Sequence, residues 1–252
     1  MKLYEIVFSP TGGTQKVVDA LCATLPAERL RVDLLDRTLA FEDIDLEENG
    51  IAVIAVPSFG GRVPEVALQR LGKIRAKGCK ALLVCVYGNR AYEDTLVELE
   101  DTARQAGFAV VAGVAAVAEH SIARQFASGR PDDLDRAQLR EFARQIWEKL
   151  SSGDLSHPAL PGNRPYKNRG GGMVPQPGDG CTQCGRCAQV CPVGAINPAD
   201  AGQMDSGRCI SCMRCVKLCP HGARGLAPQQ LAAVGEKLKP VCSDRKANEL
   251  FL

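Results

Sequence analysis

The feature that most constrains this chain is a run of closely spaced cysteines that occurs twice towards its C-terminal end. The first run is Cys181, Cys184, Cys187 and Cys191, followed by Pro192, and the second is Cys209, Cys212, Cys215 and Cys219, followed by Pro220. Each cysteine of the second run stands 28 positions after its counterpart in the first. We therefore expect a small duplicated unit built around these side chains.

The spacing C-x₂-C-x₂-C-x₃-C-P predicts two [4Fe–4S] clusters. Three cysteines at this interval can wrap one side of a cubane, and the fourth cysteine of each run ligates the other cluster. One cluster is then held by Cys181, Cys184, Cys187 and Cys219, and the other by Cys209, Cys212, Cys215 and Cys191. Zinc sites use paired cysteines without a third at the same interval, and disulfides between such close neighbours are sterically awkward.

The other four cysteines are scattered. Cys22, Cys79 and Cys85 stand at apolar positions where packed thiols are expected, and Cys242 is expected to be exposed in a C-terminal tail. No apolar run approaches the roughly 20 residues that a membrane-spanning helix needs, and the first residues lack a secretory signal pattern. We expect a cytoplasmic protein, in which dense cysteines favour metal over disulfides.

Residues 1–152 alternate between strand-like and helix-like patterns. Apolar or alternating runs at residues 3–9, 29–35, 50–56, 81–87 and 108–117 predict five strands. Helices are expected between them and over residues 132–150, with Leu134, Phe142, Ile146 and Trp147 facing inward. This alternation implies an α/β domain with a parallel sheet covered on both faces. Its commonest form is the flavodoxin-like doubly wound five-stranded sheet in the order 2-1-3-4-5.

The composition changes after residue 152. Residues 153–173 contain Pro158, Pro161, Pro165 and three consecutive glycines, which predicts a linker. Its basic residues Arg164 and Lys167, with Arg169, could also brace one domain on the other. Residues 174–227 then form the small α+β two-cluster domain, and residues 228–252 a C-terminal helix and tail.

The net charge of +2 is unevenly distributed. Residues 1–152 carry 19 Lys and Arg against 22 Asp and Glu, whereas residues 153–252 carry 12 against 7. The basic excess either compensates the negative charge of the clusters or forms a patch for an acidic partner. It lacks the interleaved aromatic residues of a nucleic-acid site, so we expect no nucleic-acid partner.

A second motif follows the first predicted strand. Ser9, Pro10, Thr11, Gly12, Gly13 and Thr14 place hydroxyl groups and free backbone N–H groups at the start of a helix, which is the chemistry of a phosphate cradle. The motif is neither a P-loop nor a dinucleotide fingerprint. A Gly-Gly turn between a strand and a helix also occurs without any ligand.

These motifs resemble two known families. Residues 174–227 resemble the bacterial two-cluster ferredoxins, and the turn at residues 9–14 resembles the flavodoxin phosphate loop [S/T]-x-T-G-x-T. Over nearly the whole chain, the two halves resemble the fused flavodoxin–ferredoxin proteins of anaerobic bacteria and archaea. The resemblance implies bound FMN, two [4Fe–4S] clusters and oxygen sensitivity.

The resemblance also implies which loops hold the flavin ring. They are the loop after the third strand, with Pro57, Ser58, Phe59, Gly60, Gly61 and Arg62, and the loop after the fourth, with Gly88, Asn89, Arg90 and Tyr92. Phe59 and Tyr92 are candidates for stacking on the ring, or else pack on the sheet edge and cap a helix. The Gly60–Gly61 peptide could flip towards the N5 atom of reduced flavin. Arg62 and Arg90 would favour an anionic flavin or simply face solvent, and His120 follows the fifth strand either as a pocket residue or as a structural one.

The resulting hypothesis is a low-potential electron carrier that relays electrons between FMN and two clusters and on to redox partner proteins. Two other functions stay open. One is a flavin-dependent reductase that acts on a small substrate and is fed by the clusters, with Arg90, His120 or Ser121 in its pocket. The other is a regulatory module that senses the redox state of its clusters. The sequence does not give the oligomeric state.

Overall fold

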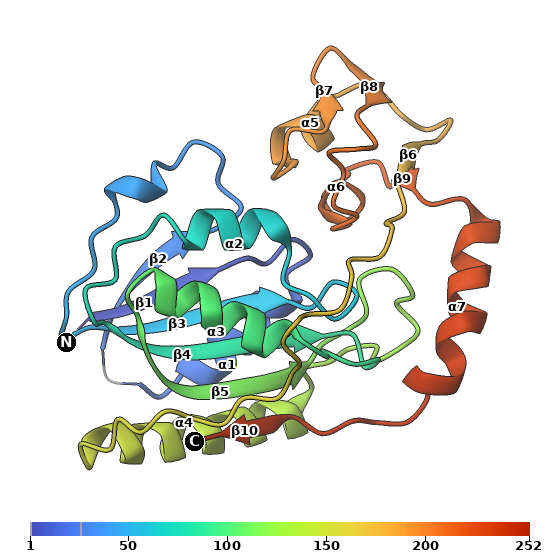
Figure 1. The fold of residues 1–252 in the computed structure, drawn as a ribbon. Coiled ribbons are helices and arrows are strands. Elements are labelled where there is room, and N and C mark those ends of the chain that lie inside the picture. The colour runs from blue at the N-terminus through green and yellow to red at the C-terminus, as the bar shows by residue number, and fades with distance from the viewer. Residues whose placement is uncertain (1, 26) are drawn as a thin grey trace.

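A computed structural model describes residues 2–25 and 27–252. It shows one six-stranded sheet with a smaller cysteine-rich module above the ends of its strands (Figure 1). The sheet has the strand order β2-β1-β3-β4-β5-β10. Its strands are β1 (Lys2–Val7), β2 (Glu28–Asp33), β3 (Ile51–Pro57), β4 (Lys80–Tyr87), β5 (Ala109–Val117) and β10 (Glu249–Phe251).

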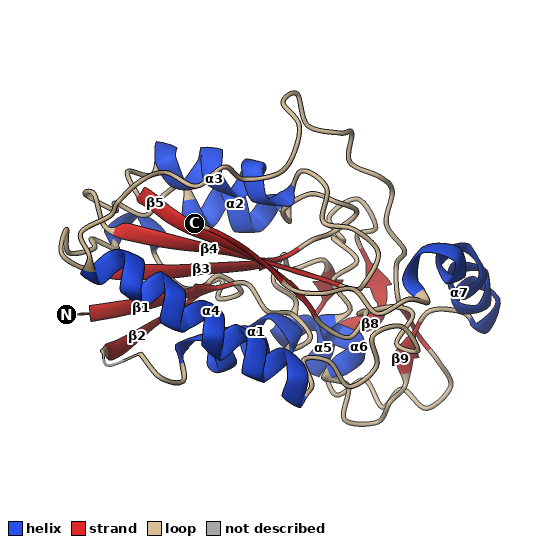
Figure 2. Ribbon diagram, turned by 90° about the horizontal axis from the view of Figure 1, so that it is seen from below, coloured by secondary structure: helices blue, strands red, loops and turns tan. Residues whose placement is uncertain are grey.

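Helices cover the sheet on both faces, as its apolar strands require (Figure 2). One core includes the inward residues of α2 (Glu65–Leu71) and α3 (Thr95–Gln105), together with Phe41 of the 3₁₀ turn η1 (Phe41–Asp43). The other includes those of α1 (Gly13–Cys22) and α4 (Asp133–Ser151). The order 2-1-3-4-5 of the five parallel strands confirms the flavodoxin-like doubly wound arrangement.

The sequence-based prediction was wrong in three details. The sheet has a sixth strand, β10, which comes from the expected tail and pairs antiparallel with β5. Cys242 is buried rather than exposed because it packs beneath the loop after β4. Leu134 is 73% exposed, because only the residues of α4 from Leu139 onward reach the core. Cys22, Cys79 and Cys85 are buried, as predicted.

The cysteine-rich module repeats its backbone as well as its sequence. The short helices α5 (Arg186–Val190) and α6 (Arg214–Lys217) begin after residues in the left-handed region, Gly185 at φ 73° and Met213 at φ 58°. Gly194 and Gly222 also match, at φ 62° and 60°. Two small antiparallel pairs complete the module: β6 (Gln176–Pro177) with β9 (Arg224–Gly225), and β7 (Ile196–Asn197) with β8 (Asp200–Met204).

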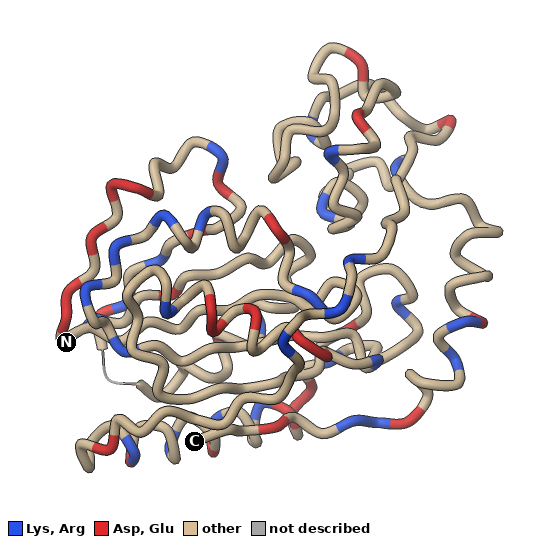
Figure 3. The backbone as a smooth tube through the Cα atoms, viewed as in Figure 1, with Lys and Arg blue, Asp and Glu red and all other residues tan. Residues whose placement is uncertain are grey.

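The segment that leads to this module, residues 158–169, runs along α3 and is called the strap below. The buried Asp94 carboxylate accepts hydrogen bonds from the backbone N–H groups of Asn163 (2.8 Å) and Lys167 (2.7 Å). Arg164 pairs with Asp101 at 2.7 Å. Basic residues of the strap therefore lie beside acidic residues of α3 and of the loop before it (Figure 3).

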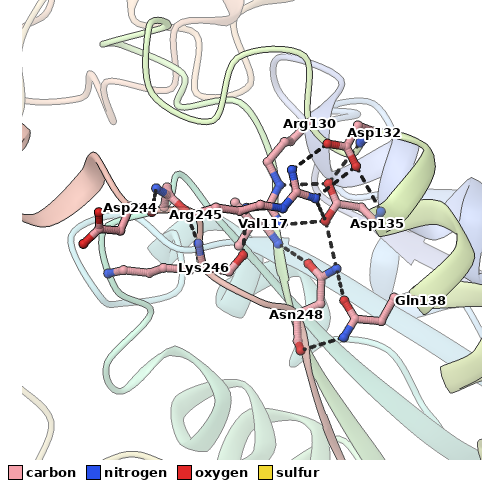
Figure 4. Close-up of polar contacts among 10 residues, drawn as sticks. Val117, Arg130, Asp132, Asp135, Gln138, Asp244, Arg245, Lys246 and Asn248 are labelled. Atoms are coloured by element: carbon pink, nitrogen blue, oxygen red, sulfur yellow. Dashed lines mark hydrogen bonds and ion pairs between the residues drawn. The ribbon is translucent and has the colours of Figure 1, made fainter.

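The chain returns from the module to the sheet through α7 (Pro228–Cys242). Residues 242–248, called the tail clamp below, then fasten it to the start of α4 (Figure 4). The guanidinium of Arg245 pairs with Asp132 at 2.6 Å and with Asp135 at 3.1 Å. The side chain of Asn248 accepts a hydrogen bond from Val117 N at 2.9 Å and donates one to Asp135 at 3.1 Å.

No helix among the described residues is long and apolar enough to cross a membrane.

Candidate functional site

The loop between β1 and α1 forms a tight turn at the start of the helix. Gly12 takes φ +92°, and a Cβ atom on Gly13 would lie only 3.2 Å from the Cβ of Ala118. Ser9 Oγ accepts a hydrogen bond from the backbone N–H of Gln15 at 2.9 Å. The N–H groups of a first helical turn have no partner within the helix and attract anions. The loop therefore has the donors that a phosphate group needs.

A cavity of about 410 Å³ opens beside this loop and is called the first cavity. Its walls come from the carboxyl ends of β1, β3, β4 and β5, where a doubly wound sheet binds its ligands. They include Thr11, Thr14, Ser58, Gly88, Ser121 and, from the cysteine-rich module, Cys212.

A larger cavity of about 1070 Å³ continues from the first and is called the second cavity. The two share Ser58, Phe59 and Ser121. The second cavity is closed on one side by residues 169–173 and on another by Cys209, Ile210 and Ser211 of the module. It therefore lies between the sheet edge and the cysteine-rich module.

The Gly60–Gly61 turn projects from β3 at the rim of this cavity. Phe59 and Arg62 exchange backbone hydrogen bonds at 2.9 and 3.2 Å, so the two glycines form the tip of a tight turn, at φ 61° and 85°. The Gly61 carbonyl accepts a hydrogen bond from Asp94 N at 3.0 Å. Among the described residues, the Gly60 carbonyl accepts no hydrogen bond. No hydrogen bond within the described part of the chain therefore fixes the carbonyl of the peptide between the two glycines, whereas the next carbonyl is anchored.

His120 lines the second cavity, and its ring accepts hydrogen bonds from the backbone. Its Nδ1 accepts hydrogen bonds from the backbone N–H groups of Ile122 (3.2 Å) and Ala123 (3.0 Å), so that nitrogen carries no proton. Burial, together with the charge of Arg90, lowers the pKa of His120. Its ring packs on Gly88, where a Cβ atom would come within 2.6 Å of His120 Cδ2.

Both arginines expected near the flavin ring form ion pairs with carboxylates instead. Arg62 forms a two-pronged pair with the buried Glu98, at 2.6 and 2.9 Å, and stacks 4.8 Å from the centre of the Tyr166 ring. Arg90 pairs with Glu93 at 2.7 Å. Neither residue lines the two cavities.

Asn89 and Tyr92 also lie apart from the cavities. The Asn89 amide donates to the carbonyls of Cys242 (2.7 Å) and Asp244 (2.8 Å). Tyr92 packs edge-on against Tyr87 and donates its hydroxyl to Glu249 of β10 at 3.1 Å. Of the two aromatic residues singled out in the sequence, the structure therefore places only Phe59 at the cavities.

The first predicted set of cluster ligands lines a single cavity. Cys181, Cys184, Cys187 and Cys219 meet around a space of about 350 Å³, called the cysteine cavity. Cys219 comes from the second run and joins three cysteines of the first. Burial works to raise the pKa of the Cys219 thiol, but backbone hydrogen bonds from residues 221–224 outweigh it and lower that pKa. Such donors stabilise a thiolate ligand.

The second set lies together towards the sheet. Burial raises the pKa of Cys212 to about 12, and the nearby sulfurs of Cys215, Cys191 and Cys209 add to the rise. Four neighbouring thiolates in a poorly solvated place repel one another unless positive charge lies between them. Iron ions supply that charge, so this chemistry fits a cluster.

The cysteines do not form a site for a single ion. Among residues 2–25 and 27–252, no three His, Cys, Asp or Glu side chains are arranged to hold a metal ion directly. In a cubane each iron takes only one cysteine, so the four ligands stand around the cluster rather than meeting at one point. The cysteine cavity has this form.

Three arginines fasten the module to the sheet. Arg70 of α2 donates to the carbonyls of Leu34 (2.6 Å) and Pro192 (2.7 Å), and Arg214 of α6 donates to Pro10 O at 3.2 Å. Arg37 reaches Ala188 O at 3.5 Å. The second set of cysteines therefore faces the cavities, with Cys212 lining the first and Cys209 the second.

The sequence did not indicate that residues of the module line these cavities. Cys209, Cys212 and Ser211 are about 200 residues from the loop after β1, and no local pattern indicates that they meet it. Ala118, Glu119 and Ser121 carry a clearer signal, because they directly follow the fifth predicted strand and thus belong to its carboxyl end.

Comparison with known proteins supports the identity of the module. Residues 180–223 match the family model of the 4Fe-4S dicluster domain. No curated protein matches the chain.

Solved structures resemble the sheet part. Streptococcus pneumonia TIGR4 flavodoxin is 16% identical, with a TM-score of 0.42 over 59% of this chain and 99% of that one. Fusobacterium nucleatum flavodoxin bound to flavin mononucleotide is also 16% identical, with a TM-score of 0.39 over 59% and 98%. The Flv1 flavodiiron core from Synechocystis sp. PCC6803 is 16% identical, with a TM-score of 0.44 over 61% and 36%.

Proposed function

We propose that this protein relays electrons between an FMN bound in the first and second cavities and two [4Fe–4S] clusters, and exchanges electrons with redox partner proteins. The observation that carries the proposal is the position of one predicted ligand set. Cys209 and Cys212 line the same two cavities as the loops that follow β1 and β3. A cluster on these cysteines would directly adjoin a ligand in the cavities.

The residues of the first cavity suit the phosphate and sugar chain of FMN. The turn at residues 9–14 offers N–H and hydroxyl donors to the phosphate, and Ser58 and Ser121 offer further hydroxyls beside it. Phe59 gives the ring an apolar wall at the junction of the two cavities. Bound FMN supplies the ability to take up two electrons together and release them singly, whereas each cluster carries one electron.

The Gly60 carbonyl, which accepts no hydrogen bond among the described residues, supports a hydrogen-bond switch at the flavin ring. The carbonyl of Gly60 can turn towards a protonated ring nitrogen without disturbing the anchored Gly61 carbonyl. His120, neutral and buried on Gly88, adds no positive charge to the second cavity. The protein's own task is then to position the cofactors and exclude water between them.

The cluster on Cys181, Cys184, Cys187 and Cys219, called the outer cluster, would be the exchange point with partners, and the cluster on the second set is called the inner cluster. In the first set Cys184 is exposed and the other three cysteines are partly exposed, whereas in the second set Cys209 is partly exposed and the other three are buried. Short distance to a partner favours rapid transfer, so electrons would enter or leave at the cysteine cavity.

The decisive experiment is anaerobic purification of the full chain, with iron, acid-labile sulfide and flavin quantified. Two cubanes and one flavin site require about eight irons and one FMN per chain. A content of about four irons, or a chain that cannot be loaded with FMN, would overturn the proposal. Cys79→Ala is a suitable control because Cys79 is packed in the sheet core far from the module.

A reductase is the second candidate, favoured by the polar groups that line the second cavity. His120 and Ser121 bring these groups to it beside Phe59. Catalytic turnover of a small acceptor by the loaded protein, abolished by His120→Ala with FMN retained, would favour this candidate.

A further inference from the structure

One arginine of the cysteine-rich module is buried without a counter-ion. Arg224, in β9, is only 4% exposed. Its Nη1 donates to Ala201 O at 2.9 Å, its Nη2 lies 3.1 Å from Met204 Sδ, and its Nε has no hydrogen-bond partner. No carboxylate among the described residues pairs with it. A buried charge in this state is strongly unfavourable unless negative charge lies nearby.

The negative charge nearest to Arg224 is that of the cysteines. Its Nη1 lies 3.9 Å from Cys187 Sγ, and its side chain lines the cysteine cavity. The guanidinium thus contacts one thiol of the first ligand set and borders the cavity that this set surrounds.

The internal repeat shows that this charge is not required by the fold. The residue 28 positions earlier, at the equivalent place in the first repeat, is Ile196, which is equally buried at 4% exposed. An apolar side chain therefore fits this backbone position. The first repeat has isoleucine at this position and the second has arginine, so the surroundings of the two ligand sets differ in charge.

We propose that Arg224 is the internal counter-charge that makes the cluster on Cys181, Cys184, Cys187 and Cys219 the more easily reduced of the two. This rests on the proposed two-cluster function. Reduction adds one electron to an already negative cluster, and a fixed cation in a poorly solvated place stabilises the reduced form. One electron then passes from the inner cluster, which is oxidised, to the outer cluster, which is reduced, with no proton transferred. The electron rests on the outer cluster, away from the flavin and close to the surface.

The test is an EPR-monitored redox titration of the full-length protein with both clusters loaded. In the unmodified protein the two midpoints should differ, with the outer cluster higher. The signals are assigned with Cys184→Ser and Cys212→Ser, each of which perturbs only the cluster that it ligates. Two coincident midpoints would overturn the inference.

The variants then isolate the guanidinium. Arg224→Gln should lower the equilibrium constant for reduction of the outer cluster at least tenfold. For a one-electron couple this is a fall of 59 mV in its midpoint potential, which brings the two midpoints closer. Arg224→Lys, which keeps the charge, should restore most of the difference. Arg136→Gln is the control, because Arg136 is an arginine at the surface of α4 that pairs with Asp133, and it should leave both midpoints unchanged.

The outcomes separate this inference from the proposed function. An unmodified chain with fewer than eight irons contradicts the two-cluster function itself. A chain with eight irons whose midpoints do not respond to Arg224→Gln contradicts only the role of Arg224. If Arg224→Gln assembles no clusters, Arg224→Ile, which carries the side chain of the equivalent Ile196, takes its place in the titration, and midpoints equal to those of the unmodified protein would contradict the role of Arg224.

Discussion

Gly61 shows how a single residue shapes the rim of the second cavity. At φ +85° it occupies backbone space that suits glycine, and a Cβ atom there would lie 1.7 Å from Glu93 Oε2 and 2.8 Å from Glu93 Cβ. Gly60 also has positive φ, but a Cβ on it would meet nothing within 4 Å. The two neighbours therefore differ in what a side chain would disturb.

We expect Gly61→Ala to lower the free energy of unfolding by about 1–3 kcal/mol, because it adds backbone strain and displaces Glu93 from its pairs with Arg90 and Lys167. Gly60→Ala adds strain alone and should cost about 1 kcal/mol. Urea unfolding of both variants measures the difference. Equal losses for the two variants would contradict the role given to the Glu93 contact.

At the same scale, Cys212 and Cys184 distinguish the two proposed clusters by position. Cys212 lines the first cavity, whereas Cys184 lies at the exposed side of the cysteine cavity. Cys212→Ser should slow electron exchange between bound FMN and the remaining cluster at least tenfold, and Cys184→Ser should leave that exchange fast. Photoreduction of each variant, followed by absorbance, gives the rates. A larger slowing in Cys184→Ser would reverse the order of the clusters.

At the scale of elements, the strap depends on ionised carboxylates. Burial acts to raise the pKa of Asp94, but hydrogen bonds from Lys167 and Asn163 outweigh it and lower that pKa. The pKa of Asp101 is lowered by its hydrogen bond with Arg164. The tail clamp follows the same rule, because Arg245 lowers the pKa of Asp132.

These pKa values set the direction of a pH dependence. A carboxyl group with a depressed pKa in the folded state contributes stability above its unfolded pKa of about 4, and that contribution is lost as the pH falls through the folded value. We expect the strap and the tail clamp to loosen below about pH 4. Limited proteolysis with pepsin between pH 5 and pH 2 should show early cuts in residues 158–169. Asp94→Asn should move these cuts to higher pH, and unchanged cutting would contradict the role of Asp94.

The edge strand β10 is a second element whose contribution can be measured. Its three residues pair with Gly113, Val114 and Ala115 of β5, and Leu250 packs against the core of α1 and α4. Deletion of residues 249–252 should lower the free energy of unfolding by about 2 kcal/mol and leave the β5 edge open to aggregation. Thermal unfolding and light scattering measure both effects. Leu252→Ala is a control, because Leu252 lies outside the strand.

The sequence predicts elements well where their signal is local. The five parallel strands and their helices follow from apolar runs and helical spacing within short windows, and the observed order 2-1-3-4-5 is the commonest one for such an alternation. β10 has no such signal, since three residues show no periodicity, and its partner strand lies more than 130 positions earlier. The same separation explains the burial of Cys242 and the attachment of Asn89 and Tyr92 to the tail.

The candidate site was predictable to the same extent. The turn at residues 9–14 and Phe59 belong to loops at the carboxyl ends of strands, which topology brings together. Arg62 pairs with Glu98, and Arg90 pairs with Glu93. These ion pairs hold the two arginines away from the cavities. Ion pairs between elements cannot be inferred from the spacing of residues in one loop.

At the scale of the whole molecule, the module is attached to the sheet at both of its ends. The strap leads into it along α3, and α7 and β10 lead back to the β5 edge of the sheet (Figure 1). Under the proposed function, transfer between flavin and clusters is then intramolecular and needs no encounter. Its rate should be independent of protein concentration and of salt between 50 and 500 mM, roughly the range over which exposed charges become screened. Flash photolysis at several dilutions tests this, and a rate proportional to concentration would show that transfer occurs between molecules.

The strand β10 also sets the order of events during synthesis. Because it occupies residues 249–251, the sheet lacks its edge strand until the ribosome has made the whole cysteine-rich module. The five earlier strands can associate first, and the last one closes the edge only when residues 174–242 have folded compactly enough to bring it back. A chain whose module has not folded therefore presents an open β5 edge, and an unpaired strand edge of this kind favours association with other chains.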